Sequence, residues 1–450
     1  MMRGLLIRQW AIVGIAVALG VCLSGGETAL AADNGANLNL QQLINRTPKG
    51  GTLTLKSAEY EGAITIDKPI RIQAEGTVRL RNGANQSAVQ IRADGVHVQG
   101  LQIVQEGREE TAAVLVTASG AVLESLDIRT RSYGIVLRDG GRNEIRHTAI
   151  RWMDSPGQPA VKLSDKRNGI DLFNSHDNRI VDNYISSMND GIYMENSHRI
   201  QVERNRIEHS RYGLHCMYID GTVMRGNVGS YNVTGAMIMG VKDVEVTGNT
   251  FFKQSESVNS QGLLFFDVQT SRIFNNKVEG NRVGLYIEQS HRNEFRNNEV
   301  VQNFVGVQFL ESEGNRFVSN RFTRNVIEAE ASESKLNAFS GNYWEAFRGI
   351  DTNGDGSSEL SYAINPFFQR LTSATPAYQL FFQSPGMLFL ESMYTSGKAE
   401  WSVDKAPLMN PEIRSEAGDA SSGSAGTLAA GLLLLFFSVF TILYLGVKRT

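Results

Sequence analysis

Short apolar quartets, each opened by a glycine, recur along residues 169–309. The first and third residues after each glycine are apolar in every copy, whereas the second varies in character. This alternation with period two predicts a strand that buries one row of side chains. Successive glycines stand 22 residues apart except for one step of 27, and they are Gly169, Gly191, Gly213, Gly235, Gly262, Gly284 and Gly306.

Two further columns of residues follow the same steps as the glycines. One is apolar: Ile180, Val202, Met224, Val246, Ile273, Phe295 and Phe317. The other is asparagine: Asn183, Asn205, Asn227, Asn249, Asn276, Asn298, Asn320 and Asn342. Three columns that share one irregular step identify an internal repeat. The asparagine column suits a structural role, because asparagine tolerates a left-handed corner and bonds to its copies in neighbouring coils.

A unit of 22 residues with short β-branched runs, Gly and Asn is typical of one coil of a parallel β-helix. Helical spacing is absent from the repeat, and the leucine template of leucine-rich repeats does not fit it. We therefore predict an all-β, right-handed parallel β-helix over residues 32–345. Residues 51–130 are less regular and form its first coils, with residues 38–44 capping the open end. Surplus residues near 154–159 and 253–261 form loops, which in solenoids often lie on the binding face.

The chain begins with a pattern typical of export and ends with one typical of membrane anchoring. Residues 1–31 combine two arginines, an apolar run and a small-residue cleavage site, so they are predicted to be a signal peptide. Residues 346–411 form an acidic loop and a C-terminal cap or docking segment, and residues 412–426 a flexible linker. Residues 427–447 carry no charge and are long enough to span a bilayer, with 448–450 as a basic cytoplasmic tail. We expect an exported protein anchored to the outer side of the cytoplasmic membrane.

Charge and cysteine content narrow the classes of partner. The 44 basic and 47 acidic residues are interspersed, so nucleic acid is not an expected partner. After removal of the signal peptide only Cys216 remains, and no internal disulfide is possible. Its place in the quartet predicts a small buried hydrophobe.

Soft donor atoms gather on two adjacent coils of the predicted solenoid. The second residue after each glycine should point outward, which puts His215 beside Met237 on neighbouring coils about 4.8 Å apart. Met217 and Met239, at the ends of the same strands, should also be neighbours. Thioethers select Cu(I) and imidazole also suits copper, so these four residues are a candidate site for transient Cu(I). The alternative is a methionine-rich hydrophobic patch that binds a partner protein.

An acidic loop follows the solenoid. It places oxygen-bearing side chains at alternate positions, as in the first half of an EF-hand loop: Asp351, Asn353, Asp355, Ser357 and Glu359. The twelfth position is Tyr362 in place of the bidentate glutamate, which excludes a true EF-hand. We expect a structural Ca²⁺ here, and the alternative is a turn rich in Asx hydrogen bonds.

Several of these segments resemble the NosD family of periplasmic maturation proteins for nitrous oxide reductase. The resemblance rests on the segments 212–218 (YGLHCMY), 235–239 (GAMIM), 341–344 (GNYW), 351–356 (DTNGDG) and 406–411 (APLMNP). It implies a non-enzymatic factor that helps assemble a copper–sulfide centre with an ABC transporter, its permease and ATPase, and a copper chaperone. His215, Met217 and Met239 fall on the family motif, whereas Met237 is added on geometry. The C-terminal anchor departs from the soluble members of the family.

Two other functions remain open on the same scaffold. A polysaccharide lyase, hydrolase or epimerase would need carboxylates or arginines clustered on an outward face. Among the outward residues that follow the glycines by two places, only Asp171 is a carboxylate. A surface adhesion or carbohydrate-binding protein is the other alternative.

Overall fold

The computed structural model describes residues 30–31, 39–108, 110–155, 157, 159–254, 257, 260–382, 384–398, 401–411, 433–435 and 438. Most of the predicted signal peptide and the whole predicted linker lie outside these residues, as does most of the predicted span at 427–447. The chain divides into two units, Met1–Met409 and Asn410–Thr450. In the part of the chain that is described, no helix has the length and apolar character required to cross a membrane.

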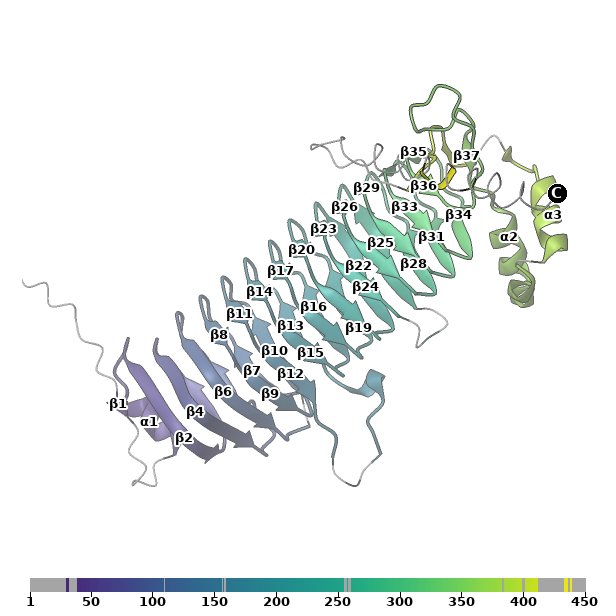
Figure 1. Cartoon of the computed structure of the whole chain (residues 1–450). Helices are drawn as coiled ribbons and strands as arrows, with labels where there is room; N and C mark the ends of the chain where they lie inside the picture. The colour runs from purple at the N-terminus through teal and green to yellow at the C-terminus, as the bar shows by residue number, and fades with distance from the viewer. Residues whose placement is uncertain are drawn as a thin grey trace, which may run out of the picture. The chain divides into compact units, whose positions relative to one another are not determined.

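The first unit is a stack of coils, each of which contributes one strand to a twelve-stranded parallel sheet (Figure 1). Its strands, in spatial and chain order, are β3 (Ile64–Ile66), β5 (Val89–Ile91), β7 (Ala112–Val116), β10 (Tyr133–Arg138), β13 (Ile170–Phe173), β16 (Asp190–Glu195), β19 (Tyr212–Met217), β22 (Thr234–Lys242), β25 (Gln261–Gln269), β28 (Val283–Glu288), β31 (Val305–Leu310) and β34 (Ile327–Ser332). The quartets of the sequence lie on this sheet from β13 to β31.

Two more ladders of parallel strands complete each coil. The first contains β8 (Val122–Glu124), β11 (Glu144–Arg146), β14 (Arg179–Val181), β17 (Gln201–Glu203), β20 (Val223–Arg225), β23 (Glu245–Thr247), β26 (Arg272–Phe274), β29 (Glu294–Arg296), β32 (Arg316–Val318) and β35 (Ala338–Ser340). The second contains β9 (Asp127–Thr130), β12 (Ala149–Trp152), β15 (Tyr184–Ser186), β18 (Arg206–Glu208), β21 (Val228–Ser230), β24 (Thr250–Phe252), β27 (Lys277–Glu279), β30 (Glu299–Val301), β33 (Arg321–Thr323) and β36 (Tyr343–Trp344). The pairing of each strand with its copy in the next coil confirms the predicted parallel β-helix.

The first coils are irregular, as the sequence predicts. Longer strands replace the separate short ones there, namely β2 (Thr52–Glu61), β4 (Arg71–Asn82) and β6 (His97–Gln105), and the short strand β1 (Leu30–Ala31) pairs with β2. Helix α1 (Leu40–Arg46) covers this end by burying Leu40 and Ile44 against the first coils, and the side chain of Asn39 caps its N-terminus. The surplus residues after β12 form a loop that contains the 3₁₀ helix η1 (Leu163–Asp165).

The other end of the stack carries a mainly helical cap (Figure 1). Its elements are β37 (Tyr362–Ala363), α2 (Phe367–Ala374), the 3₁₀ helix η2 (Pro376–Phe381), α3 (Pro385–Met393) and β38 (Val403–Asp404). Strand β38 pairs with β35, so the cap continues the solenoid by one incomplete rung. Phe368, Phe382 and Met387 bury one another and pack against Phe304 and Ile327.

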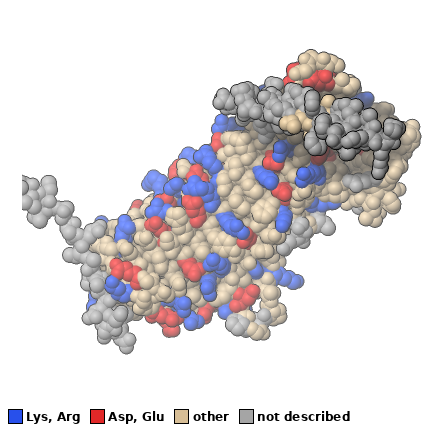
Figure 2. Space-filling view, in the orientation of Figure 1, with Lys and Arg blue, Asp and Glu red and all other residues tan. Residues whose placement is uncertain are grey.

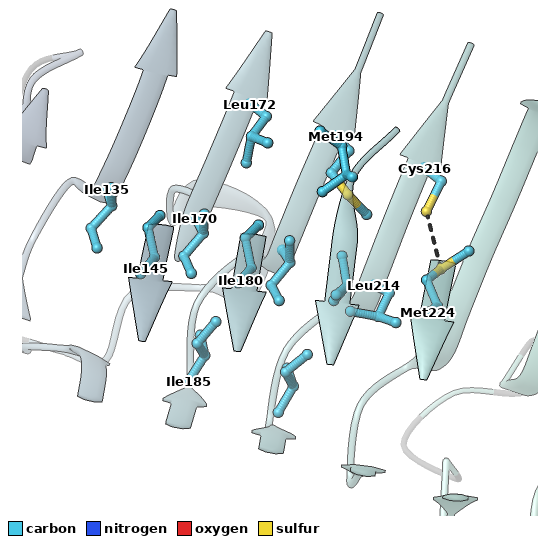
Figure 3. Close-up of a cluster of buried hydrophobic side chains, with 14 of the residues drawn as sticks. Ile135, Ile145, Ile170, Leu172, Ile180, Ile185, Met194, Leu214, Cys216 and Met224 are labelled. Atoms are coloured by element: carbon cyan, nitrogen blue, oxygen red, sulfur yellow. Dashed lines mark hydrogen bonds between the residues drawn. The ribbon is translucent and has the colours of Figure 1, made fainter. Parts of the chain in front are cut away.

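One continuous core runs through the coils, filled from all three ladders. Phe295, Phe317 and Phe339 stack on successive coils with ring centroids 4.5 and 4.8 Å apart. Cys216 is fully buried in this core and points toward Met224, whose sulfur lies 3.6 Å from its thiol (Figure 3). Burial raises the pKa of the Cys216 thiol. The predicted role of Cys216 as a buried hydrophobe is confirmed.

The asparagine column forms a buried hydrogen-bonded ladder. In each rung the amide Nδ2 donates to the Oδ1 of the next asparagine, at 2.9 Å from Asn183 to Asn205 and 3.0 Å from Asn205 to Asn227. Asn342 ends the series, and its Nδ2 donates to Asp404 of β38 at 2.9 Å. A carboxylate from the cap therefore takes the place of the next asparagine.

The left-handed corners lie one residue before the asparagines. Positive φ angles occur at Asp182 (56°), Arg204 (52°) and Gly226 (64°), whereas the asparagines that follow do not adopt this conformation. The expectation that the asparagine itself occupies the left-handed position is thus wrong. Its side chain is used for the ladder, and the preceding residue makes the turn.

Candidate functional site

The glycine that opens each quartet shapes the outer face of the twelve-stranded sheet. A Cβ on Gly191 would lie 2.3 Å from Cγ2 of Ile207 and 2.6 Å from the carbonyl oxygen of Gly213, so a larger residue does not fit. The strand pairing runs from Asp190↔Tyr212 directly to Ile192↔Leu214, so the glycines of both strands are left unpaired while the register is kept. The alternation is interrupted at this glycine, and the residue before it, Asp190, reaches the outer face, where it bonds to His215.

His215 lies on this outer face but is almost completely covered. Its neighbours in the sequence, Leu214 and Cys216, belong to the core, whereas its own ring meets the edges of two tyrosine rings. The centroids of Tyr193 and Tyr212 lie 4.9 and 4.8 Å from the imidazole. Only 6% of His215 is exposed. The predicted outward direction is therefore correct, but the expected exposure is wrong because the tyrosines close over the ring.

The imidazole of His215 is held from one side. Its Nδ1 lies 2.8 Å from Oδ2 of Asp190, which is 1% exposed, and Arg211 binds the same carboxylate through two nitrogens at 2.9 and 2.7 Å. Burial alone would raise the pKa of Asp190, but the hydrogen bonds from His215 and Arg211 outweigh it and lower the pKa. A carboxylate on Nδ1 fixes the ring orientation and leaves Nε2 as the free nitrogen.

The other ring nitrogen of His215 has no partner. Nε2 is buried and makes no hydrogen bond with any described residue. A buried polar atom without a partner costs about 1–3 kcal/mol, so such atoms call for an explanation. A histidine that bonds a carboxylate through one nitrogen and keeps the other free is the usual arrangement of a metal-binding imidazole.

The methionines lie where the repeat predicts them. His215 pairs with Met237, and Met217 pairs with Met239, in the register between β19 and β22. All three methionines are partly exposed. The hydroxyl of Tyr193 lies 3.5 Å from the sulfur of Met217 and donates to Glu195 at 2.7 Å. The fold thus brings the four predicted residues onto two adjacent strands of one face.

Copper handling here would rest on methionine sulfur. Among the described residues, no three His, Cys, Asp or Glu side chains lie together in a way that could hold a metal ion. One imidazole with thioethers is a donor set for Cu(I), which hard cations do not share.

Sequence reasoning missed several charged groups on the same face. Asp190 directly precedes Gly191, where the alternation is interrupted, and Arg211 directly precedes β19. One coil earlier, Asp171 is buried and bonded to Arg138 at 2.6 Å and to Nδ2 of Asn168 at 2.6 Å. The carboxylates of this face are therefore more numerous than the single Asp171 expected. The sequence does show a charged residue one place before Gly191 and two places before Gly213, and this signal could have indicated them.

The acidic loop is organised by its own hydrogen bonds. Asp351 accepts from the backbone N–H of Gly354 at 2.7 Å and of Gly356 at 2.9 Å, which lowers its pKa. Asp355 accepts from the N–H of Ser357 at 2.7 Å, and Glu359 from that of Thr352 at 3.0 Å. These bonds account for the loop as a series of Asx turns. Calcium binding by the loop stays a prediction.

Charges on the remaining surface are mixed in sign (Figure 2). Many of the arginines pair with carboxylates of the same or a neighbouring coil, as Arg204 does with Asp182 at 2.9 Å and Arg199 with Asp177 at 2.7 Å. Such exposed pairs contribute little to stability individually. They leave no extended basic surface in this view.

Comparison with known proteins connects this face to one family. Residues 153–349 match the family model "Periplasmic copper-binding protein (NosD)". The chain is 28% identical over 151 residues to the "Probable ABC transporter binding protein NosD" of Pseudomonas aeruginosa, covering 32% of this chain and 34% of the relative. It is 27% identical over 142 residues to the protein of the same name from Stutzerimonas stutzeri, covering 30% and 31%. The chain thus matches about a third of the length of these relatives.

Among solved structures with a similar course of the chain are two of low identity. The periplasmic alginate epimerase AlgG, as a double mutant, is 12% identical with a TM-score of 0.49 over 67% of this chain and 82% of that one. A family 28 exopolygalacturonase of Yersinia enterocolitica is 10% identical with a TM-score of 0.49 over 66% and 74%. The family match covers both strands that carry His215 and the three methionines. Over residues 153–349 this parallel β-helix chain is therefore similar to the NosD family.

Proposed function

We propose that this protein is an exported, non-enzymatic maturation factor that handles Cu(I) during assembly of the copper–sulfide centre of nitrous oxide reductase. Cu(I) is its cargo, bound transiently by His215 with Met217, Met237 and Met239. An ABC transporter, a copper chaperone and the reductase are the proposed partners, as the family resemblance implies. The names of the relatives support the first of these partners, because they describe ABC transporter binding proteins.

The observation that carries the proposal is the unpartnered Nε2 of His215. Asp190 holds the opposite nitrogen at 2.8 Å, so Nε2 is the ring nitrogen left to bind a ligand at the outer face. Met237 follows on the next strand, and Met217 and Met239 follow along the same two strands. Thioethers bind Cu(I) weakly enough for transfer and exclude hard cations.

A polysaccharide-active enzyme is less well supported by the same residues. A general base works best with a pKa near the operating pH. Asp190 has a lowered pKa because His215 and Arg211 outweigh its burial, and Tyr193 has a raised pKa because of burial and its bond to Glu195. Asp171 is engaged by Arg138 at 2.6 Å. Each of these groups is engaged by another side chain, which suits holding a ligand residue more than transferring a proton.

The proposed location of the protein, outside the cytoplasmic membrane and tethered to it, rests on the predicted signal peptide and the predicted membrane anchor. Export by residues 1–31 and anchoring by residues 427–447 would leave the solenoid outside the cytoplasmic membrane, tethered through residues 412–426. The tether would keep a factor of this kind near its membrane-bound transporter. Truncation after Gly426 should release the protein from washed membranes, and retention there without any partner would contradict the anchor.

The copper proposal is tested by Cu(I) competition titration of the full-length protein and by reductase maturation in cells. His215→Ala combined with Met217→Leu should lower Cu(I) affinity at least 10-fold and abolish maturation under limiting copper. The matched control replaces an exposed histidine and an exposed methionine elsewhere, His209→Ala with Met393→Leu. Wild-type affinity and maturation in the first variant would refute the proposed site.

A further inference from the structure

A second site lies on the same outer face, between the sheet and the C-terminal cap. A cavity of about 510 Å³ opens there, a size found in small-molecule sites. Its floor is formed by strands β25 to β34 and its wall by α2, η2 and Phe382. None of His215, Met217, Met237 and Met239 lines it, although the floor residue Leu264 pairs with Met237 in the strand register.

Two buried polar side chains that line this cavity have hydrogen-bonding groups that are not fully satisfied. Glu330 is 5% exposed and accepts one hydrogen bond, from Nε2 of Gln308 at 3.1 Å. Gln369 on α2 is also 5% exposed, and its Oε1 is buried without any partner among the described residues. A buried carbonyl oxygen that nothing satisfies is costly, so a ligand that donates a hydrogen bond would be stabilised there.

The charges around the cavity argue against an anionic ligand. Arg282 is the one cation of the lining, and it is already engaged by Gln379 at 2.7 Å and by the ring of Phe304, 4.0 Å from its guanidinium carbon. Two carboxyl groups, Glu288 and Glu330, face the same space. Phosphates and polyanions are bound by several free arginines or lysines or by helix N-termini, which this lining does not offer.

The floor of the cavity also argues against an extended peptide. Peptide strands bind to sheet edges, where backbone groups are free. Here the ligand would face a sheet whose backbone groups pair with neighbouring coils. Only side chains remain, and amide and carboxyl groups pair best with hydroxyls, which both donate and accept. Apolar floor residues such as Val283 and Val305 suit the C–H face of a ring.

We propose that the cavity between β25–β34 and the cap binds a neutral saccharide of one or two rings. A hydroxyl of the sugar donates to Oε1 of Gln369, and Glu330 and Gln308 bond to its neighbours from the floor. Phe304 and the valines contact the apolar side of the ring. This site is independent of the copper proposal, since the two share no side chain.

The test is a titration of the full-length protein, in a detergent without a sugar headgroup, with maltose, cellobiose and N,N′-diacetylchitobiose. Calorimetry and ligand-observed NMR should show saturable binding of at least one of them. Gln369→Leu and Glu330→Leu should each weaken that binding at least 10-fold, whereas Glu330→Gln, which keeps a hydrogen-bond donor, should retain it.

Control variants distinguish a loss of sugar binding at the cavity from unfolding of the protein and from an effect of the copper site. Gln201→Leu, an exposed glutamine on β17, should bind the sugar as wild type does, and so should the His215→Ala/Met217→Leu protein. Circular dichroism and the melting temperature show whether each variant is folded. Absence of saturable binding by all three disaccharides, equal binding by a folded Gln369→Leu protein, or tighter binding of digalacturonate would each overturn the proposal.

Discussion

His215 and Glu330 stand in one row of side chains on the outer face of the twelve-stranded sheet and have opposite surroundings. The register leads from His215 through Met237, Leu264, Tyr286 and Gln308 to Glu330. Both are buried, although the repeat places them on the outside. A charged network of Asp190 and Arg211 covers the histidine end, whereas amides of the cap and Arg282 of the solenoid, which is itself engaged, surround the glutamate end.

The difference teaches that an outward position in a solenoid does not determine the electrostatic state of a side chain. The pKa of Asp190 lies below its usual range because two partners outweigh burial. Burial raises the pKa of Glu330 from 4.5 to about 7, and Arg282 offsets only part of this effect. One end therefore holds a stable charge, and the other holds a carboxyl that is half protonated near neutral pH.

The largest effect should come from breaking the charged end. Asp190→Asn should lower the free energy of unfolding by about 3 kcal/mol at pH 7, because it removes one partner of a buried charged network. The native pKa of Asp190 is depressed, so its contribution exists above the unfolded pKa of about 4 and is lost as pH falls. Urea unfolding at pH 7 and pH 3.5 should show the difference between variant and wild type shrinking at the lower pH.

Asp190→Asn also tests whether His215 binds Cu(I). Loss of a carboxylate behind a ligating histidine typically weakens metal binding about 10- to 100-fold. Cu(I) affinity of Asp190→Asn should fall within that range, while Glu203→Gln on β17 should leave it unchanged. Equal unfolding free energies of variant and wild type at pH 7 would contradict the role assigned to Asp190.

The opposite sign is expected at the glutamate end. Glu330 has a raised pKa, so the folded state binds the extra proton between pH 4.5 and about 7 and loses stability as pH rises through that range. Glu330→Gln removes this loss and should raise the free energy of unfolding by about 2 kcal/mol at pH 8, with little change at pH 4.5. Thermal and urea unfolding at both values measure the difference, with the exposed Glu61→Gln as the control. A variant that is destabilised at pH 8 would show that Glu330 is paired.

A smaller effect on Cu(I) affinity should distinguish Tyr193 from Tyr286, two tyrosines that each donate to a glutamate two residues later. Tyr193 donates to Glu195 at 2.7 Å and Tyr286 donates to Glu288 at 2.9 Å, but the hydroxyl of Tyr193 also lies 3.5 Å from the sulfur of Met217. Replacing either with phenylalanine should cost about 1 kcal/mol of stability. Tyr193→Phe should in addition change Cu(I) affinity about threefold, whereas Tyr286→Phe should not. Identical copper titrations for the two variants would remove Tyr193 from the site.

The smallest effect is expected from calcium, a hard cation that the soft donors of the histidine end should ignore. Chelation should lower the melting temperature by a few degrees if the acidic loop binds Ca²⁺, because a bound ligand stabilises the folded state. Cu(I) affinity should not change. Asp351→Asn should abolish the calcium response, and equal melting temperatures in EDTA and in millimolar calcium would leave the loop as a set of Asx turns.

Repetition made the solenoid predictable from sequence. Columns such as Asn183 to Asn342 and the glycines of the quartets determine the coil length, the parallel pairing and the register of His215 with Met237. Each of these properties follows from a local period that stacking multiplies over the coils. Cys216 was assigned to the core on the same grounds, since alternation alone decides which side of a strand faces inward.

Contacts between residues of different coils or segments were decided only by the tertiary structure. The interrupted alternation at Gly191 leaves Asp190 on the outer face, which simple alternation does not reveal. The burial of His215 depends on Tyr193 and Tyr212 closing over it from two strands. The raised pKa of Glu330 depends on a cap whose residues follow it by some 40 positions in the chain. The sequence by itself determined the coil position and the face of the sheet for each side chain of the repeat, because both follow from a short-range period. The tertiary structure decided which groups cover and pair with these side chains, because burial and charge depend on neighbours distant in sequence.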